Sequence, residues 1–151
     1  LRKATLHDAR FLYDLRNEEA VRQASFSTDL ISWEHHARWF QNKLAGNDSV
    51  IFVAEIDGAP AGQVRFDFRE DGEADNNVAI SRMYRGQGYG SRIVKSASEY
   101  FFTAFPKVRK IHAFIRPTNE TSLKVFAGAG YRRVGKRRVK GESCVEMTLE
   151  I

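Results

Sequence analysis

The sequence predicts a single domain of the α/β (α+β) class, with a mixed central sheet of about seven strands flanked by about four helices. Three observations carry this prediction. The chain has 151 residues, the size of one ordinary domain, and 42% of them are hydrophobic, enough for a sizeable core. Its apolar residues recur at helical spacing in some stretches and alternate in others. No repeat or internal boundary is visible, so one domain is expected over residues 1–151.

The first third of the chain is predicted to be mainly helical. Residues 1–4 are expected to form a short strand, and Thr5 with Asp8 fits a capping box that begins the first helix. A second helix is predicted over residues 33–46, with Ser32 as its N-cap. Its expected buried stripe consists of Trp33, Ala37, Phe40 and Leu44.

Strands and helices are predicted to follow in a mixed order. A hairpin is expected from residues 49–56 and 62–69, then a polar turn at 70–77 and a third strand at 78–84. The later elements are a long helix over 89–105, a strand over 110–115, a short helix over 119–130 and a closing hairpin around Gly141.

Charge and cysteine content narrow the function classes. The net charge is +5, but apart from residues 136–140 the basic residues are scattered, so nucleic acid is not an expected partner. No apolar run approaches 18 residues, so no membrane span is expected. Cys144 is the single cysteine and the first ten residues lack a signal-peptide core, which predicts a cytoplasmic protein. No metal site is expected.

A glycine-rich turn, "YRGQGYG" at residues 84–90, lies between a predicted strand and the start of the long helix. Helix N-termini present unpaired N–H groups and a positive dipole end, and glycines let an anion approach them closely. Arg85 adds a cation. The spacing fits neither a dinucleotide fold nor a P-loop. The turn therefore predicts a phosphate cradle, with a purely structural tight turn as the alternative.

The stretch "ISRMYRGQGYGSRIV" resembles the acyl-CoA-binding motif of the GNAT superfamily of N-acetyltransferases, Arg/Gln-x-x-Gly-x-Gly/Ala. Arg85, Gly88 and Gly90 fill that motif, while Asn119 and the pair Gly130-Tyr131 resemble a second hallmark of the superfamily. The resemblance covers essentially the whole chain and implies the GNAT fold, with acetyl-CoA as cofactor. It also implies that the strand after residue 78 splays from strand 110–115, leaving an open edge. The implied cofactor-binding residues are Ile80, Arg82, Arg85, Gly86, Gln87, Gly88, Tyr89, Gly90, Asn119 and Phe126.

The N-terminal third contains Arg16-Asn17, Val21-Arg22, Ser25, Ile31-Ser32 and a His36-x-x-Trp39-Phe40 run. This pattern resembles a narrower group, the acetyltransferases of nucleotide-linked amino sugars found in pseudaminic-acid biosynthesis. A primary amine on such a sugar is therefore the expected acceptor. A Trp beside polar groups can stack on a sugar or a uracil ring, and arginines can meet a diphosphate. The alternative is a structural role, in which Trp39 caps the core, His36 bonds a backbone carbonyl and Arg16 solvates a helix end. The expected substrate-binding residues are Arg16, Asn17, Arg22, His36 and Trp39.

The attacking amine must be neutral, and a sugar amine should titrate near the α-amino value of about 8, so a carboxylate acting through water suffices as base. Glu73 and Asp75 are the candidate bases, with Glu55 and Asp67 as further possibilities. By resemblance, a backbone N–H near Ile80 would bind the oxyanion.

One position departs from the superfamily pattern. Many relatives carry a Tyr seven residues after the Asn, and that Tyr protonates the leaving thiolate; here the position is Phe126. This departure leaves open the interpretation that the chain is a catalytically silent acyl-CoA-binding sensor. Independently, a protein N-terminal acetyltransferase of the ribosomal-protein type is an alternative, against which the basic N-terminal third argues weakly. Whether the chain forms a homodimer through its final hairpin is also left open.

Overall fold

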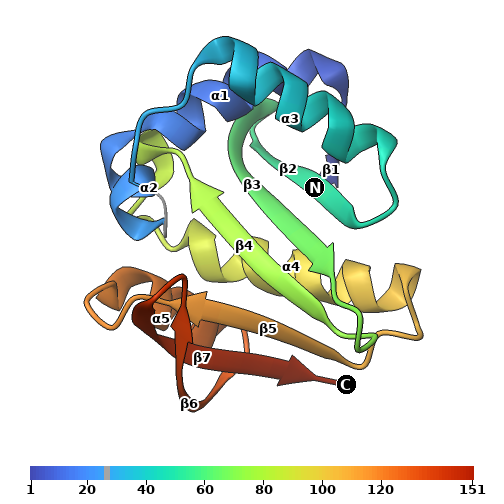
Figure 1. Cartoon of the computed structure of the whole chain (residues 1–151), viewed down its shortest axis with the longest axis vertical. Helices are drawn as coiled ribbons and strands as arrows, with labels where there is room; N and C mark the ends of the chain where they lie inside the picture. Colours follow the sequence, from blue (N-terminus) through green and yellow to red (C-terminus); the bar gives the residue numbers. More distant parts are fainter. Residues whose placement is uncertain (26–27) are drawn as a thin grey trace.

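A computed structural model describes residues 1–25 and 28–151 and is built on one mixed sheet (Figure 1). All neighbouring strands run antiparallel except β4 and β5, which run parallel. This arrangement confirms the predicted mixed sheet of about seven strands. In spatial order the strands are β1 (Arg2–Lys3), β2 (Ser49–Ile56), β3 (Ala59–Phe68), β4 (Ala74–Ile80), β5 (Lys110–Ile115), β7 (Glu142–Glu150) and β6 (Arg132–Val139).

Helices cover both faces of the sheet, as predicted (Figure 1). One face carries α1 (Ala9–Asn17), α2 (Glu19–Ala24) and α3 (Trp33–Ala45), and the other carries α4 (Tyr89–Ala104) and α5 (Glu120–Gly128). The sequence predicted two helices before β2, whereas the described residues form three. The reason is Glu18, whose backbone (φ −59°, ψ 137°) is not helical and separates α1 from α2.

The larger core lies between the sheet and α4. The rings of Phe66 and Phe101 stack with their centroids 4.2 Å apart, and both side chains are fully buried. The smaller core lies under α1 and α3 and includes Leu12, Leu15 and Phe40. In α3 the predicted stripe is partly wrong: Trp33 is 38% exposed and packs edge-on against Tyr13, and His36 is buried in its stead.

A buried polar network joins the two halves of the sheet under the β4–β5 junction. The hydroxyl of Tyr131 accepts a hydrogen bond from Asn76 Nδ2 at 2.9 Å and shares another with Ser98 Oγ at 2.9 Å. Burial raises the pKa of Tyr131 to about 12, so the phenol stays neutral and can serve all three elements. This network ties β4, α4 and the start of β6 together.

The boundaries of the third strand differ from those expected. β4 begins at Ala74 and ends at Ile80, so four residues assigned to a polar turn, 74–77, pair with β3, while Arg82–Tyr84 form a 3-10 turn. Side chains alternate along the strand, so Asp75 and Asn77 share its more exposed face, whereas Asn76 points the other way and is buried with its amide bonded to Tyr131. In the part of the chain that the structure describes, no helix is long and apolar enough to span a bilayer.

Candidate active site

The strands β4 and β5 pair at only two positions and then diverge. Ala74 is opposite Ile111 and Asp75 is opposite His112, whereas the rest of β4 keeps its ladder with β3 alone. Figure 1 shows the two strands separating toward their C-terminal ends. The predicted splay is confirmed, and it leaves a wedge that is closed at Asp75 and open beyond it.

The open edge of β4 presents backbone groups at alternate residues. The N–H of Ser81 donates to the carbonyl of Ala61 at 2.8 Å, which fixes the phase of the β3–β4 ladder. Because antiparallel partners alternate, Asn76, Val78 and Ile80 turn their N–H and C=O groups toward the wedge. An extended molecule that carries amides could therefore pair with this edge as an added strand does.

The glycine-rich turn follows directly and ends at the N-terminus of α4. Gly86 and Gly88 have φ values of +74° and +83°, and a Cβ at either position would meet no atom within 4 Å. These two glycines thus give the turn a left-handed backbone and an open side. Because the first N–H groups of α4 have no partner within the helix, they form a site for an anion.

Gly90 has a different reason to be glycine. A Cβ there would lie 2.8 Å from Cγ2 of Val125 on α5. The hydroxyl of the next residue, Ser91, donates to the Val125 carbonyl at 3.1 Å. Gly90 therefore lets α4 pack closely on α5, a function that the sequence pattern did not separate from the approach of a phosphate.

The side chain of Arg85 points back to the protein instead of into the glycine turn. Its Nε donates to the carbonyl of Ile80 at 2.8 Å, and its guanidinium forms an ion pair with Glu18. The same oxygen of Glu18 accepts the backbone N–H of Arg82 at 3.0 Å. In this conformation the Arg85 side chain is therefore engaged by Ile80 and Glu18. These residues border an open hollow of about 420 Å³ beside α2.

Asp75 stands at the closed end of the wedge. Burial raises the pKa of its carboxyl above the ordinary value, an effect that the guanidinium of Arg69, at 3.2 Å, partly opposes. A carboxylate of raised basicity at this position is suited to accept a proton from an attacking group.

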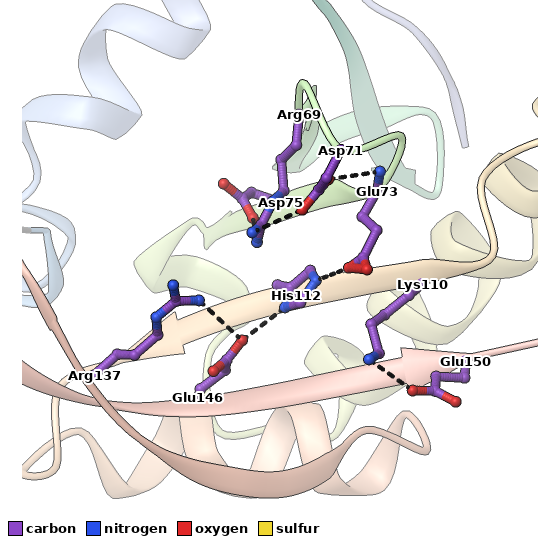
Figure 2. A network of polar contacts seen from close by, with 9 residues as sticks. All are labelled: Arg69, Asp71, Glu73, Asp75, Lys110, His112, Arg137, Glu146 and Glu150. Atoms are coloured by element: carbon purple, nitrogen blue, oxygen red, sulfur yellow. Dashed lines mark hydrogen bonds and ion pairs between the residues drawn. The ribbon is translucent and has the colours of Figure 1, made fainter.

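Glu73, the other predicted base, is engaged with His112 (Figure 2). The second ring nitrogen of His112, Nδ1, lies 2.7 Å from Oε2 of Glu146, which also meets Arg137 at 3.7 Å. The ring of His112 thus bridges the two carboxylates through its two nitrogens. Through His112, Glu73 therefore links the turn before β4 to β5 and β7. Of the two predicted bases, Asp75 is the one outside this bridge and the better candidate to accept a proton.

The predicted substrate residues lie together in the layer of α1, α2 and α3. His36 is only 4% exposed, and its ring centroid is 5.7 Å from that of Trp39. Burial lowers the pKa of His36, and the charge of Arg16 lowers it further, so the ring stays neutral. Trp39 also carries the guanidinium of Arg65 over its ring, at 5.3 Å from the centroid. His36 and Trp39 are thus largely occupied by packing.

Asn17 and Arg22 hold the segment that leads into α3. The amide of Asn17 bonds both backbone groups of Ile31, each at 2.9 Å. Arg22 donates to the carbonyls of Asn17 and Thr28 at 3.2 and 3.3 Å. These contacts are structural, and they fix the position of α2 beside the wedge.

Several predicted cofactor residues serve the fold in this structure. Asn119 is the N-cap of α5, where its Oδ1 accepts the N–H of Ser122 at 3.1 Å. Phe126 is 3% exposed and packs edge-on against Tyr131 in the larger core. Gln87 donates to the Met83 carbonyl at 2.8 Å, and Tyr89 contacts Tyr84 edge to face.

Four residues of this region were not predicted from the sequence: Glu18, Arg65, His112 and Glu146. The alternation of side chains along a strand could have indicated two of them. It places Arg65 on the same face of β3 as Asp67, and His112 on the same face of β5 as Lys110 and Phe114. Glu18 gave no local signal, since its partners lie more than 60 residues away.

Comparisons with known proteins agree with this geometry. Residues 1–132 match the model of a family described as an acetyltransferase (GNAT) domain. The chain is 24% identical over 138 residues to the spermidine N(1)-acetyltransferase of Escherichia coli (strain K12), which covers 90% of this chain and 74% of that protein.

Solved structures share the fold over almost the whole chain. AAC(6')-Ib in complex with ribostamycin and coenzyme A superposes with a TM-score of 0.88 at 20% identity, covering 99% of this chain and 91% of that one. Spermidine N-acetyltransferase from Vibrio cholerae, in complex with CoA and spermine, gives 0.85 at 18% identity, covering 99% and 93%. The protein has the GNAT fold that the resemblance implied. With the family model matching nearly nine-tenths of its length, the chain belongs to the GNAT acetyltransferases and is an acetyl-CoA-dependent N-acetyltransferase.

Proposed function

We propose that the protein acetylates the primary amine of a nucleotide-linked amino sugar, with acetyl-CoA lying along the open edge of β4. The single observation that carries the placement of acetyl-CoA is the wedge beyond Asp75, which leads along the edge to the N-terminus of α4. In this arrangement the backbone groups of Val78 and Ile80 would meet the pantetheine amides, and Gly86–Gly90 would hold the pyrophosphate. Arg82 would extend the cofactor-binding edge of β4, and Nδ2 of Asn119 would contact the pantetheine arm of the cofactor.

Asp75 is proposed as the base. The amine attacks the thioester carbonyl, the C–N bond forms, the C–S bond breaks, and the ammonium proton passes to Asp75 directly or through water. The thiolate takes a proton from solvent, because Phe126 has none to give, and Asp75 returns the proton it accepted to solvent, so that no net proton is left on the enzyme. A thiol pKa of about 8.5 makes this departure feasible without a side-chain acid.

The distribution of charge supports an acceptor that carries both an amine and an anion. Burial lowers the pKa of Arg16, and the nearby charges of Arg65 and Arg22 lower it further. Three guanidinium groups therefore lie near one another. Carboxylates gather instead at the closed end of the wedge, around Asp75. An acceptor could place its ammonium near the carboxylates and a diphosphate near the arginines.

A polyamine is the second candidate, because a curated relative is a spermidine N(1)-acetyltransferase. The acidic residues Glu73, Asp75 and Glu146 could attract a polycation. The arginine group would repel its second ammonium, which favours the first candidate.

An acceptor panel tests this proposal. Release of free CoA is measured with a nucleotide-linked amino sugar, spermidine, an aminoglycoside and a peptide with a free N-terminus. We expect the sugar nucleotide to give the highest kcat/KM, and Arg65→Gln to raise its KM while lowering that of spermidine. Turnover of spermidine or the peptide alone would overturn the acceptor assignment. Binding of acetyl-CoA with no CoA release for any acceptor would favour the silent sensor.

A further inference from the structure

We infer that Glu18 is a positioning residue for acetyl-CoA, which holds the turn between β4 and the glycine cradle in its binding conformation. The inference rests on acetyl-CoA lying along β4, and it is independent of which amine is the acceptor. Glu18 would touch neither the thioester nor the amine, and would act through Arg82 and Arg85.

The position of Glu18 is set by the break between α1 and α2. Its side chain is 21% exposed, and it extends from this break to the C-terminal end of β4. One carboxylate oxygen accepts both the backbone N–H of Arg82 and the guanidinium of Arg85. Charge-assisted hydrogen bonds to a largely buried acceptor are among the stronger polar contacts in proteins.

Arg85 connects Glu18 to the end of β4. While its guanidinium is held by Glu18, its Nε bonds the Ile80 carbonyl at 2.8 Å. The 3-10 turn Arg82–Tyr84 is thereby fixed at both ends, immediately before the left-handed Gly86. A ligand site whose backbone donors are fixed beforehand loses less conformational entropy on binding. Removing Glu18 should therefore weaken the cradle without changing any residue in it.

The same contact anchors one end of α2 across the mouth of the wedge. At the other end of α2, Arg116, which follows β5, donates through Nε and a terminal nitrogen to the carbonyl of Ser25 at 3.2 and 2.7 Å. The helix thus runs from the end of β4 to the end of β5 (Figure 1). Glu18 couples the layer of the predicted acceptor site to the cofactor cradle.

An opposite role for Glu18 makes a different prediction. A carboxylate on Arg82 and Arg85 could occupy groups that would otherwise bind the cofactor, so that it competes with acetyl-CoA. In that case its removal would tighten binding. The sign of the change in affinity distinguishes positioning from competition.

The test compares Glu18→Ala and Glu18→Gln with Glu19→Gln, an adjacent exposed residue whose substitution changes the net charge equally. Calorimetry should show acetyl-CoA binding about tenfold weaker in Glu18→Ala, the loss expected for one charged hydrogen bond. Glu18→Gln should weaken it less, because its amide oxygen still accepts the Arg82 N–H. Glu19→Gln should match the parent.

Kinetics separate positioning from general loss of structure. At saturating acetyl-CoA, kcat of Glu18→Gln should stay within about twofold of the parent, while the KM for acetyl-CoA rises. Circular dichroism at the assay temperature checks that each variant is folded. Affinity that is unchanged or tighter in both Glu18 variants would overturn the inference. Failure of the parent to bind acetyl-CoA would instead refute the cofactor site itself.

Discussion

Replacing Gly88 with valine should abolish acetyl-CoA binding while leaving the fold intact. Gly88 has φ +83° and caps α4, and a Cβ there meets no protein atom within 4 Å. The substitution therefore creates no clash, and its cost is the left-handed backbone, about 1–2 kcal/mol. For a chain of this length that cost corresponds to a drop in Tm of about 2–8 °C.

Gly72→Val is the matched control. Gly72 has φ +85° and the same open surroundings, but it lies in the turn before β4, at the opposite end of that strand from the cradle. Both variants should lose similar stability, and only Gly88→Val should lose the cofactor. In the parent and in Gly72→Val, acetyl-CoA at 100 times its Kd should stabilise the fold by about 2.7 kcal/mol.

The assays are isothermal titration calorimetry and thermal unfolding with and without acetyl-CoA. Gly88→Val should give no heat of binding and no ligand-induced rise in Tm. An unchanged Kd in Gly88→Val would refute the cradle, and equal loss of binding in Gly72→Val would mean that backbone strain, and not blocked phosphate approach, is responsible.

Three further predictions concern the end of the wedge and the core. Because burial raises the pKa of Asp75, the folded state holds its proton more tightly than the unfolded chain, so its ionisation costs stability as pH rises through that pKa. Asp75→Asn should therefore raise Tm at pH 7, but should leave Tm unchanged at a pH below the ordinary aspartate pKa. The substitution should also remove the acidic limb of the pH profile of kcat/KM. Unchanged activity would exclude Asp75 as the base. His112→Gln should cost about 3–5 kcal/mol in urea unfolding, because Glu73 and Glu146 lose the ring that bridges them, and a cost under about 1 kcal/mol would contradict a structural role for this bridge. Phe126→Tyr should lower stability by about 1–3 kcal/mol by burying a hydroxyl, with no rise in kcat; a faster enzyme would show that this ring faces the thioester.

The fold and the cofactor cradle could be predicted because their signals are local. Helical spacing, alternation and a capping residue such as Ser32, whose Oγ accepts the His35 N–H at 3.2 Å, lie within a few residues of one another. The glycines before α4 likewise sit beside the helix that they serve. The start of β4 was missed because residues 75–77 are polar on both faces of the strand, with Asn76 buried against Tyr131, so the apolar alternation that identifies strands is lost.

The side-chain geometry of the site could not be predicted, because it depends on contacts between distant segments. Arg85 fits the motif, yet its conformation is set by Glu18, 67 residues earlier. Glu73 was selected as a base for its position before β4, but His112 on β5 determines what it contacts. No local pattern reports such pairs, since they exist only once the sheet has assembled.

The placement of acetyl-CoA is the central claim, and backbone amide NMR during a titration with acetyl-CoA tests it most directly. The largest chemical-shift changes are expected at the open edge of β4, at Asn76, Val78 and Ile80, and at Gly86–Gly90 before and within the first turn of α4. The turn at Gly72 and the exposed strand β6 should be unaffected. Saturable binding that leaves the amides of β4 and of Gly86–Gly90 unchanged would contradict the account.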